Sequence, residues 1–155
     1  MRLGDAVAPD SSVPERGRAR RVPRGIARVL AAAGLAVDAA VHARVAAQYD
    51  AVTATIGQGT LFRVEAVLAA IAALLVLIWR RPAADIFAWL VATGGLALLL
   101  LYTYVDVGTL GPVPNMYERA WTGDKKIAAL AQAVAVLATV FLLSTRARPP
   151  GRHRR

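Results

Sequence analysis

Residues 86–105 form an uninterrupted apolar stretch, IFAWLVATGGLALLLLYTYV, without a charged side chain. A helix rises about 1.5 Å per residue, so a stretch of this length spans about 30 Å, the thickness of the hydrocarbon core of a bilayer. Three other stretches of similar character occur at residues 26–48, 60–79 and 127–144. We therefore expect an all-α, polytopic membrane protein whose domain, residues 26–144, is an antiparallel four-helix transmembrane bundle.

The composition supports a membrane protein and excludes several kinds of chemistry. Of the 155 residues 57% are hydrophobic, and the mean hydropathy is +0.47, more than a soluble domain usually carries. Because cysteine is absent, there is no disulfide, thiolate metal site or iron–sulfur cluster. His42 is the only histidine in a predicted span, which excludes a bis-histidine haem within one chain. The sequence contains no nucleotide-binding glycine motif, and its serines lie only in tails or at a helix end, so a Ser-His-Asp triad has no nucleophile.

Most of the positive charge lies on one side of the predicted membrane. Of the 19 Lys and Arg residues, fourteen precede or begin the first helix, fill the loop at 80–81, or follow the fourth helix. By the positive-inside rule both termini are cytoplasmic, in a bacterial plasma membrane. We expect residues 1–25 and 145–155 to be disordered basic tails that attract membrane lipids and bind no nucleic acid, because no aromatic residues are interleaved with their charges. The alternative is a cleaved signal peptide over residues 1 to about 40, but Asp38 interrupts its apolar stretch.

Polar side chains in the predicted spans gather toward the outer leaflet. Asp38 and His42 lie about 18 Å and about 24 Å along the first helix and, four residues apart, share one helix face. Glu65 lies near the outer entry of the second helix, and Tyr102 and Asp106 close the outer end of the third. Because ionisable groups in a span usually face the bundle or a cavity, we expect these five residues to line an outer-leaflet ligand cavity. The cytoplasmic halves of the spans read as almost wholly apolar, which disfavours a transport path.

Three interpretations of Asp38, His42 and Glu65 stay open. The three side chains could form a self-satisfied polar cluster that fixes helix packing. They could bind a small ligand or transfer a proton, with Asp38 holding one ring nitrogen of His42 and Glu65 approaching the other. They could also hold a metal ion such as zinc or iron, although one histidine is a sparse ligand set.

The predicted outer loop, residues 106–126, is longer than the roughly 2–8 residues usual between neighbouring helices. We expect it to form a lid over the cavity, in which Asn115 caps a short surface helix carrying Tyr117 and Trp121 on its apolar side. The alternative is an interfacial anchor that covers nothing, because Tyr and Trp settle at membrane boundaries in any case.

Short basic tails, four Ala/Leu/Val-rich spans and an outer polar cluster together resemble the small four-helix bacterial membrane proteins, among them the DoxX-like proteins, whose roles are mostly undefined. The resemblance covers nearly the whole chain as architecture and implies no functional residues. Four-helix quinone-linked thiol oxidases are also similar, but they depend on cysteines. We expect a non-enzymatic membrane protein that binds a lipid, a small hydrophobic ligand or the helix of another membrane protein. The alternative is a membrane enzyme or redox accessory in which Asp38, His42 and Glu65 transfer protons or bind a metal.

Overall fold

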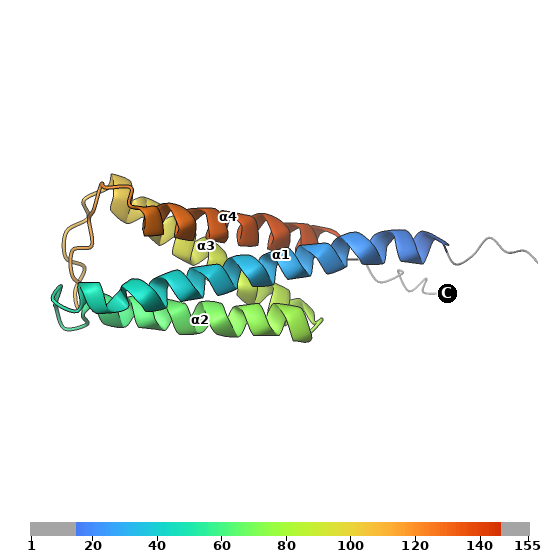
Figure 1. Ribbon diagram of the computed structural model, residues 1–155, viewed down its shortest axis with the longest axis horizontal. Coiled ribbons are helices and arrows are strands. Elements are labelled where there is room, and N and C mark those ends of the chain that lie inside the picture. Colours follow the sequence, from blue (N-terminus) through green and yellow to red (C-terminus); the bar gives the residue numbers. More distant parts are fainter. Residues whose placement is uncertain (1–14, 147–155) are drawn as a thin grey trace, which may run out of the picture.

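Four long helices make up most of the molecule (Figure 1). The computed structural model describes the backbone of residues 15–146 and the side chains of residues 22–146. The helices are α1 (Glu15–Val45), α2 (Gln58–Ile78), α3 (Pro82–Tyr104) and α4 (Gly123–Ser144), and the short 3-10 helix η1 (Ala46–Tyr49) continues α1. Over residues 15–146 no β-strand forms, and one isolated bridge joins Leu110 to Val113.

All four helices are long and apolar enough to cross a membrane. The candidate spans are Val22–Tyr49, Gln58–Ile78, Pro82–Tyr104 and Gly123–Ser144. Large apolar side chains such as Leu130 and Leu137 lie on the outside of the bundle and are about 70% exposed. Such a surface would be unfavourable in water and suits acyl chains. The predicted all-α fold with four membrane-capable helices is therefore confirmed, and it is compatible with a small multi-pass membrane protein.

Local sequence signals set where the helices begin. Pro82 is the first residue of α3 and follows an extended Arg81, because the fixed φ of proline suits the first helical position. At the start of α4, the Thr122 side chain accepts a hydrogen bond from the backbone N–H of Lys125. Because α3 begins at Pro82, the turn between α2 and α3 is short. A longer irregular loop, residues 105–122, joins α3 to α4.

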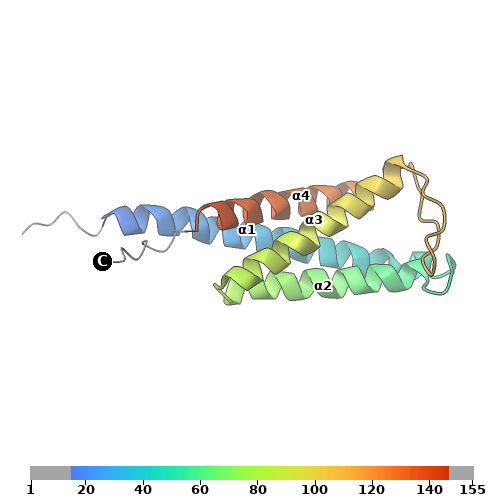
Figure 2. The same cartoon turned by 180° about the vertical axis from the view of Figure 1, so that it is seen from behind.

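The helices lie side by side, and α3 crosses them obliquely (Figure 2). α1 packs against α2 and α4, and α3 packs against the same two helices while hardly touching α1. The segment of α1 around Arg24 and Arg28, the end of α2, the start of α3 and the end of α4 meet at one end of the bundle, and the start of α1 projects beyond this end (Figure 1). We call it the arginine end, and its arginines are Arg24, Arg28, Arg80, Arg81 and Arg146. The opposite end, formed by η1 and loop 105–122, is the loop end.

Small residues allow the helices to approach one another closely. The core consists mainly of buried alanines from all four helices, with Leu35, Val76 and Leu142 among them. A Cβ atom added at Gly34 would lie only 2.6 Å from the carbonyl oxygen of Ala131. α1 and α4 are therefore in near backbone contact, as is common where helices associate in lipid.

The structure corrects two expectations about the arginine end. α1 begins at Glu15, so residues 15–25 belong to a helix; arginine is a good helix former, and Arg24 packs against the end of α4. The expectations for residues 1–14 and 147–155 lie outside the described residues. The apolar interior expected here is also interrupted, because Arg28 and Asp85 are 7% and 0% exposed and compensate each other's charge.

The predicted short helix in loop 105–122 is absent. Gly108 and Gly111 adopt positive φ values, +66° and +56°, and Pro112 and Pro114 follow closely. These residues leave only a short segment before α4, and a helix of so few residues is unstable without further support. The loop instead turns between Leu110 and Val113.

Candidate functional site

A cavity of about 480 Å³ lies at the loop end, between the helices and loop 105–122. Its walls are mainly apolar and include Val41, Leu61, Phe62, Leu99 and Met116. Its polar lining consists of His42, Gln48, Tyr49, Gln58, Glu65, Tyr102, Glu118, Thr122, Asp124 and Lys125. An apolar cavity with a few polar groups, in this range of size, is typical of small-molecule sites.

Asp38 and His42 meet on one face of α1. His42 lines the cavity, whereas Asp38 is completely buried behind it. The Nδ1 atom of His42 lies 3.1 Å from the Asp38 carbonyl oxygen and 3.1 Å from Asp38 Oδ1. The imidazole also packs edge-on against Phe62 of α2, with ring centroids 5.4 Å apart. The four-residue spacing predicted this pairing, in which the Nδ1 side of the imidazole faces Asp38 and the Nε2 side faces away from it.

Glu65 of α2 and Gln132 of α4 converge on Gly95 of α3. A Cβ atom at Gly95 would lie 2.6 Å from Glu65 Oε1 and 2.5 Å from Gln132 Nε2. Among the described residues, Glu65 Oε1, Asp38 Oδ2 and both amide atoms of Gln132 are buried without a hydrogen-bond partner, whereas Asp38 Oδ1 lies beside His42 Nδ1. A buried polar atom left without a partner costs about 1–3 kcal/mol. α1, α2 and α4 therefore each contribute buried polar atoms without partners near the middle of the bundle.

Polar contacts hold loop 105–122 over the cavity. The backbone N–H of Glu118 donates to the carbonyl oxygen of Tyr102, 3.0 Å away at the end of α3. The hydroxyl of Tyr49 donates to Glu118 Oε2 at 3.1 Å, and Lys125 Nζ donates to the Glu118 carbonyl oxygen at 2.6 Å. Glu118 thus joins the loop to η1, α3 and α4.

Two further ion pairs lie at the loop end. Arg44 of α1 pairs with Asp124 of α4. Arg63 of α2 donates to both carboxylate oxygens of Asp50, at 2.7 and 2.8 Å, and lowers the pKa of Asp50 below its ordinary value of 3.8 because these hydrogen bonds favour the charged form. Both partners of the Arg63–Asp50 pair are about half exposed, so the pair contributes little stability. Arg63 therefore pairs with Asp50 and not with Glu65, whose carboxylate has no guanidinium partner.

Among the other predicted site residues, Tyr102 lines the cavity and is 8% exposed. Asp106 does not line it. Asp106 follows the end of α3 and is exposed, and its Oδ1 accepts hydrogen bonds from Asn115 Nδ2 at 2.9 Å and from the Gly108 N–H at 3.1 Å. Asp106 therefore shapes the loop, and its predicted place in the cavity is wrong because the chain turns immediately after α3.

The predicted lid residues also lie outside the cavity lining. Asn115 Oδ1 accepts a hydrogen bond from the Tyr117 N–H, which makes a local turn in place of a helix cap. The ring of Trp121 lies beside Tyr104, with centroids 6.3 Å apart. The part of the loop that lines the cavity consists of Val113, Met116, Glu118 and Thr122.

Several residues in or beside the cavity were missed from the sequence, among them Gln132, Phe62 and Glu118. Gln132 could have been found, because it is the only strongly polar side chain within the fourth apolar stretch, and such a side chain usually faces the bundle. Phe62 and Glu118 carried no comparable signal, because an aromatic residue near a span end and an acidic residue in a loop are both ordinary at a membrane boundary.

Neither a metal-binding geometry nor similarity to known proteins assigns a function to this cavity. Across the described side chains, residues 22–146, no group of three His, Asp or Glu is arranged to hold a metal ion. A scan against protein-family models, a search of curated proteins and a search of solved structures find no match to the chain. The function must therefore be inferred from the site's own chemistry.

Proposed function

We propose that the chain is a binding protein of the bacterial plasma membrane, without enzymatic activity, which holds a small amphipathic molecule in the loop-end cavity. Its helices form an antiparallel bundle with both termini in the cytoplasm, so the cavity lies in the outer leaflet. The ligand has an apolar body and one group that is cationic or donates hydrogen bonds, such as a primary amine.

The apolar lining supports the proposed ligand body. Most of the lining surface is apolar, and it surrounds about 480 Å³. This volume lies within the range of about 300–1,000 Å³ that small-molecule sites occupy. Burial of an apolar body in such a cavity is favoured by about 25 cal/mol for each Å² removed from water.

The observation that carries the proposal is the buried Oε1 of Glu65, which has no hydrogen-bond partner among the described residues. Glu65 lines the cavity, so its carboxylate lies in the wall around a bound ligand. The other lining carboxylates, Glu118 and Asp124, already have partners in Lys125 and Arg44. A donor that pairs with Glu65 removes the penalty of an unpaired acceptor and adds a charge-assisted hydrogen bond.

Proton transfer by His42 is the second candidate function. Asp38 holds Nδ1 of His42, and Glu65 lines the same cavity, which is an arrangement suited to passing a proton. Under this alternative His42→Gln abolishes function, whereas ligand binding tolerates the change and depends on Glu65.

Two probes of equal chain length test the proposal in detergent micelles: decylamine and decanoate. Isothermal titration should show that the purified protein binds decylamine at least about tenfold more tightly, because only the amine can pair with Glu65. Glu65→Gln should remove most of this preference. Ala128→Phe should fill the cavity, which Ala128 lines, and weaken the binding of both probes.

The matched control for Ala128→Phe is Leu130→Phe on the same helix. Leu130 is 69% exposed on the outside of the bundle, so this variant should bind both probes as the original protein does. Equal affinity for amine and carboxylate would contradict the proposed ligand class. Unchanged binding by a monodisperse Ala128→Phe variant would show that the cavity is not the binding site.

A further inference from the structure

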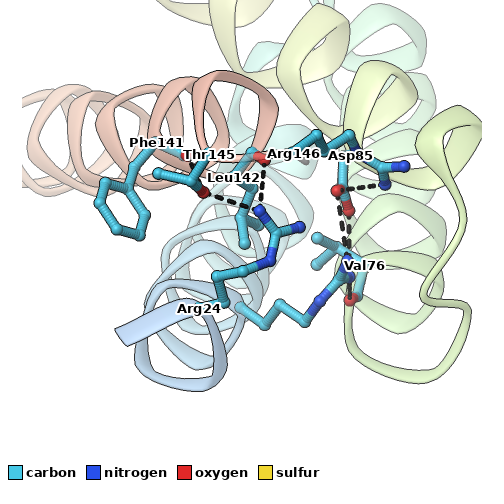
Figure 3. Close-up of polar contacts among 8 residues, drawn as sticks. Arg24, Val76, Asp85, Phe141, Leu142, Thr145 and Arg146 are labelled. Atoms are coloured by element: carbon cyan, nitrogen blue, oxygen red, sulfur yellow. Dashed lines mark hydrogen bonds and ion pairs between the residues drawn. The ribbon is translucent and has the colours of Figure 1, made fainter. Parts of the chain in front are cut away.

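Two arginines and one carboxylate form a buried network at the arginine end (Figure 3). Arg28 of α1 donates from Nη1 to the Val76 carbonyl oxygen of α2 at 2.6 Å, and its Nη2 lies 3.2 Å from Asp85 Oδ2 of α3. Arg146, which follows α4, donates from Nη2 to the same Asp85 oxygen at 2.7 Å. Asp85 is 0% exposed, so it holds both guanidinium groups in place without reaching the surface itself.

A third arginine lies next to this network. Arg24 of α1 donates from Nη1 to the Leu142 carbonyl oxygen at 3.0 Å and to the Thr145 hydroxyl at 2.7 Å (Figure 3). Both acceptors are neutral, so the charge of Arg24 is not compensated by them. Thr145 directly precedes Arg146, so Arg24 of α1 binds the segment of chain that carries Arg146.

Hydrogen-bonding capacity remains on both arginines. A guanidinium has five N–H donors. Arg146 uses Nη2 for Asp85, and its Nε is buried without a hydrogen-bond partner among the described residues. The Arg146 side chain is 26% exposed and Arg24 is half-buried, so solvent-borne groups can reach them.

The charge balance is uneven between the two ends. Over residues 22–146, the arginine end carries five arginines and only one carboxylate, that of Asp85. The other six acidic residues of this range lie in the loop-end half: Asp38, Asp50, Glu65, Asp106, Glu118 and Asp124. The arginine end therefore attracts anions, and its partly buried guanidinium groups are oriented before an anion arrives.

We infer that Arg24 and Arg146 form a binding site for a phosphate group, with Asp85 and Arg28 as the buried support that orients Arg146. Guanidinium groups bind phosphate oxygens through paired hydrogen bonds, and two such groups at the same end of the bundle can bind one phosphate from two directions. The source of the phosphate is an anionic phospholipid or free inorganic phosphate. This inference is independent of the ligand proposed for the loop-end cavity.

The test compares lipid retention by single variants in native mass spectrometry. Detergent-purified protein receives equimolar phosphatidylglycerol and phosphatidylcholine, and we expect the protein to retain phosphatidylglycerol preferentially. Arg24→Gln, which leaves the Asp85 network intact, should reduce the preference about fivefold. Arg146→Lys keeps the positive charge but loses the planar group and should also reduce it. The matched control is Arg80→Gln, which removes one exposed charge at the same end and should have a smaller effect.

A separate arm measures the thermal midpoint with inorganic phosphate and no added lipid. A stabilisation that depends on Arg24 and occurs without lipid preference supports the site and makes free phosphate its ligand. Lipid preference without phosphate stabilisation supports the site and makes phospholipid its ligand. An equal loss of preference in Arg80→Gln and Arg24→Gln would overturn the inference, because the attraction would then be a general effect of charge. Unchanged behaviour of Arg24→Gln in both arms would also overturn it.

Discussion

Glu65 is the residue at which a role in helix packing and a role in ligand binding predict the most different results. A packing residue contributes stability through the contacts that it satisfies, whereas a residue kept for a ligand carries a penalty until the ligand arrives. Glu65 Oε1 is buried and unpaired, and Glu65 lines a cavity, which is the pattern expected of a residue kept for a ligand.

Glu65→Gln should therefore leave the thermal stability of the ligand-free protein unchanged or raise it, by up to about 1–3 kcal/mol, because a buried carboxylate is replaced by a neutral amide. The measurement is the thermal midpoint in detergent, with the half-exposed Asp50→Asn as a control for loss of one negative charge, because its pair with Arg63 contributes little stability. A clear loss of stability in Glu65→Gln alone would assign Glu65 to helix packing.

At the scale of the helices, α1 and α4 depend on a close approach at Gly34. A Cβ at this position would meet the Ala131 carbonyl oxygen at 2.6 Å and the Ala135 Cβ at 3.2 Å. The carbonyl belongs to the backbone of α4, so the contact is relieved only if the two helices move apart.

Gly34→Ala should destabilise the protein by about 1–3 kcal/mol, the usual effect of overpacking. Gly25→Ala is the matched control, because Gly25 lies in the same helix and has no atom within 4 Å of an added Cβ. The control should be neutral or stabilise slightly, since alanine is the better helix former. Thermal melts of both variants check this, and equal midpoints would mean that α1 and α4 do not pack as described.

How far the sequence predicts these elements depends on the kind of signal. Hydropathy identified all four helices, because a membrane span is a property of composition over about 20 residues. The i,i+4 spacing also predicted the Asp38–His42 contact, which lies within one helix. The Arg28–Asp85 pair was not predicted, because its partners are far apart in the chain and helix order alone does not set their rotation. The prediction of a short helix capped by Asn115 was wrong, because the positive φ values at Gly108 and Gly111 turn the chain and leave too short a segment for a helix.

At the scale of the whole molecule, charge is distributed along the bundle axis. The arginine end carries an excess of positive charge over residues 22–146, whereas the loop end carries slightly more acidic than basic residues. By the positive-inside rule we propose that the arginine end faces the cytoplasm.

The absence of cysteine makes this orientation easy to map, because a single introduced cysteine is the only thiol in the chain. In intact cells, a membrane-impermeant maleimide should label Thr109→Cys in loop 105–122 and should not label Ala83→Cys at the start of α3. Both positions are exposed, so lysed cells should show labelling of both. Labelling of Ala83→Cys in intact cells would reverse the orientation.

The central claim is that the loop-end cavity is accessible and that Glu65 gives it a free carboxylate. The reaction rates of one thiol introduced into the cavity test this claim most directly. Ala128→Cys places the thiol in the cavity lining, and Leu130→Cys places it on the outside of the same helix. We predict that a cationic methanethiosulfonate reagent modifies Ala128→Cys several-fold faster than an anionic one, since Glu65 attracts the cation, and that Glu65→Gln reduces this ratio. The ratio for Leu130→Cys should not respond to Glu65→Gln. An unreactive Ala128→Cys, or a ratio independent of Glu65, would contradict an accessible cavity with a free carboxylate in its wall.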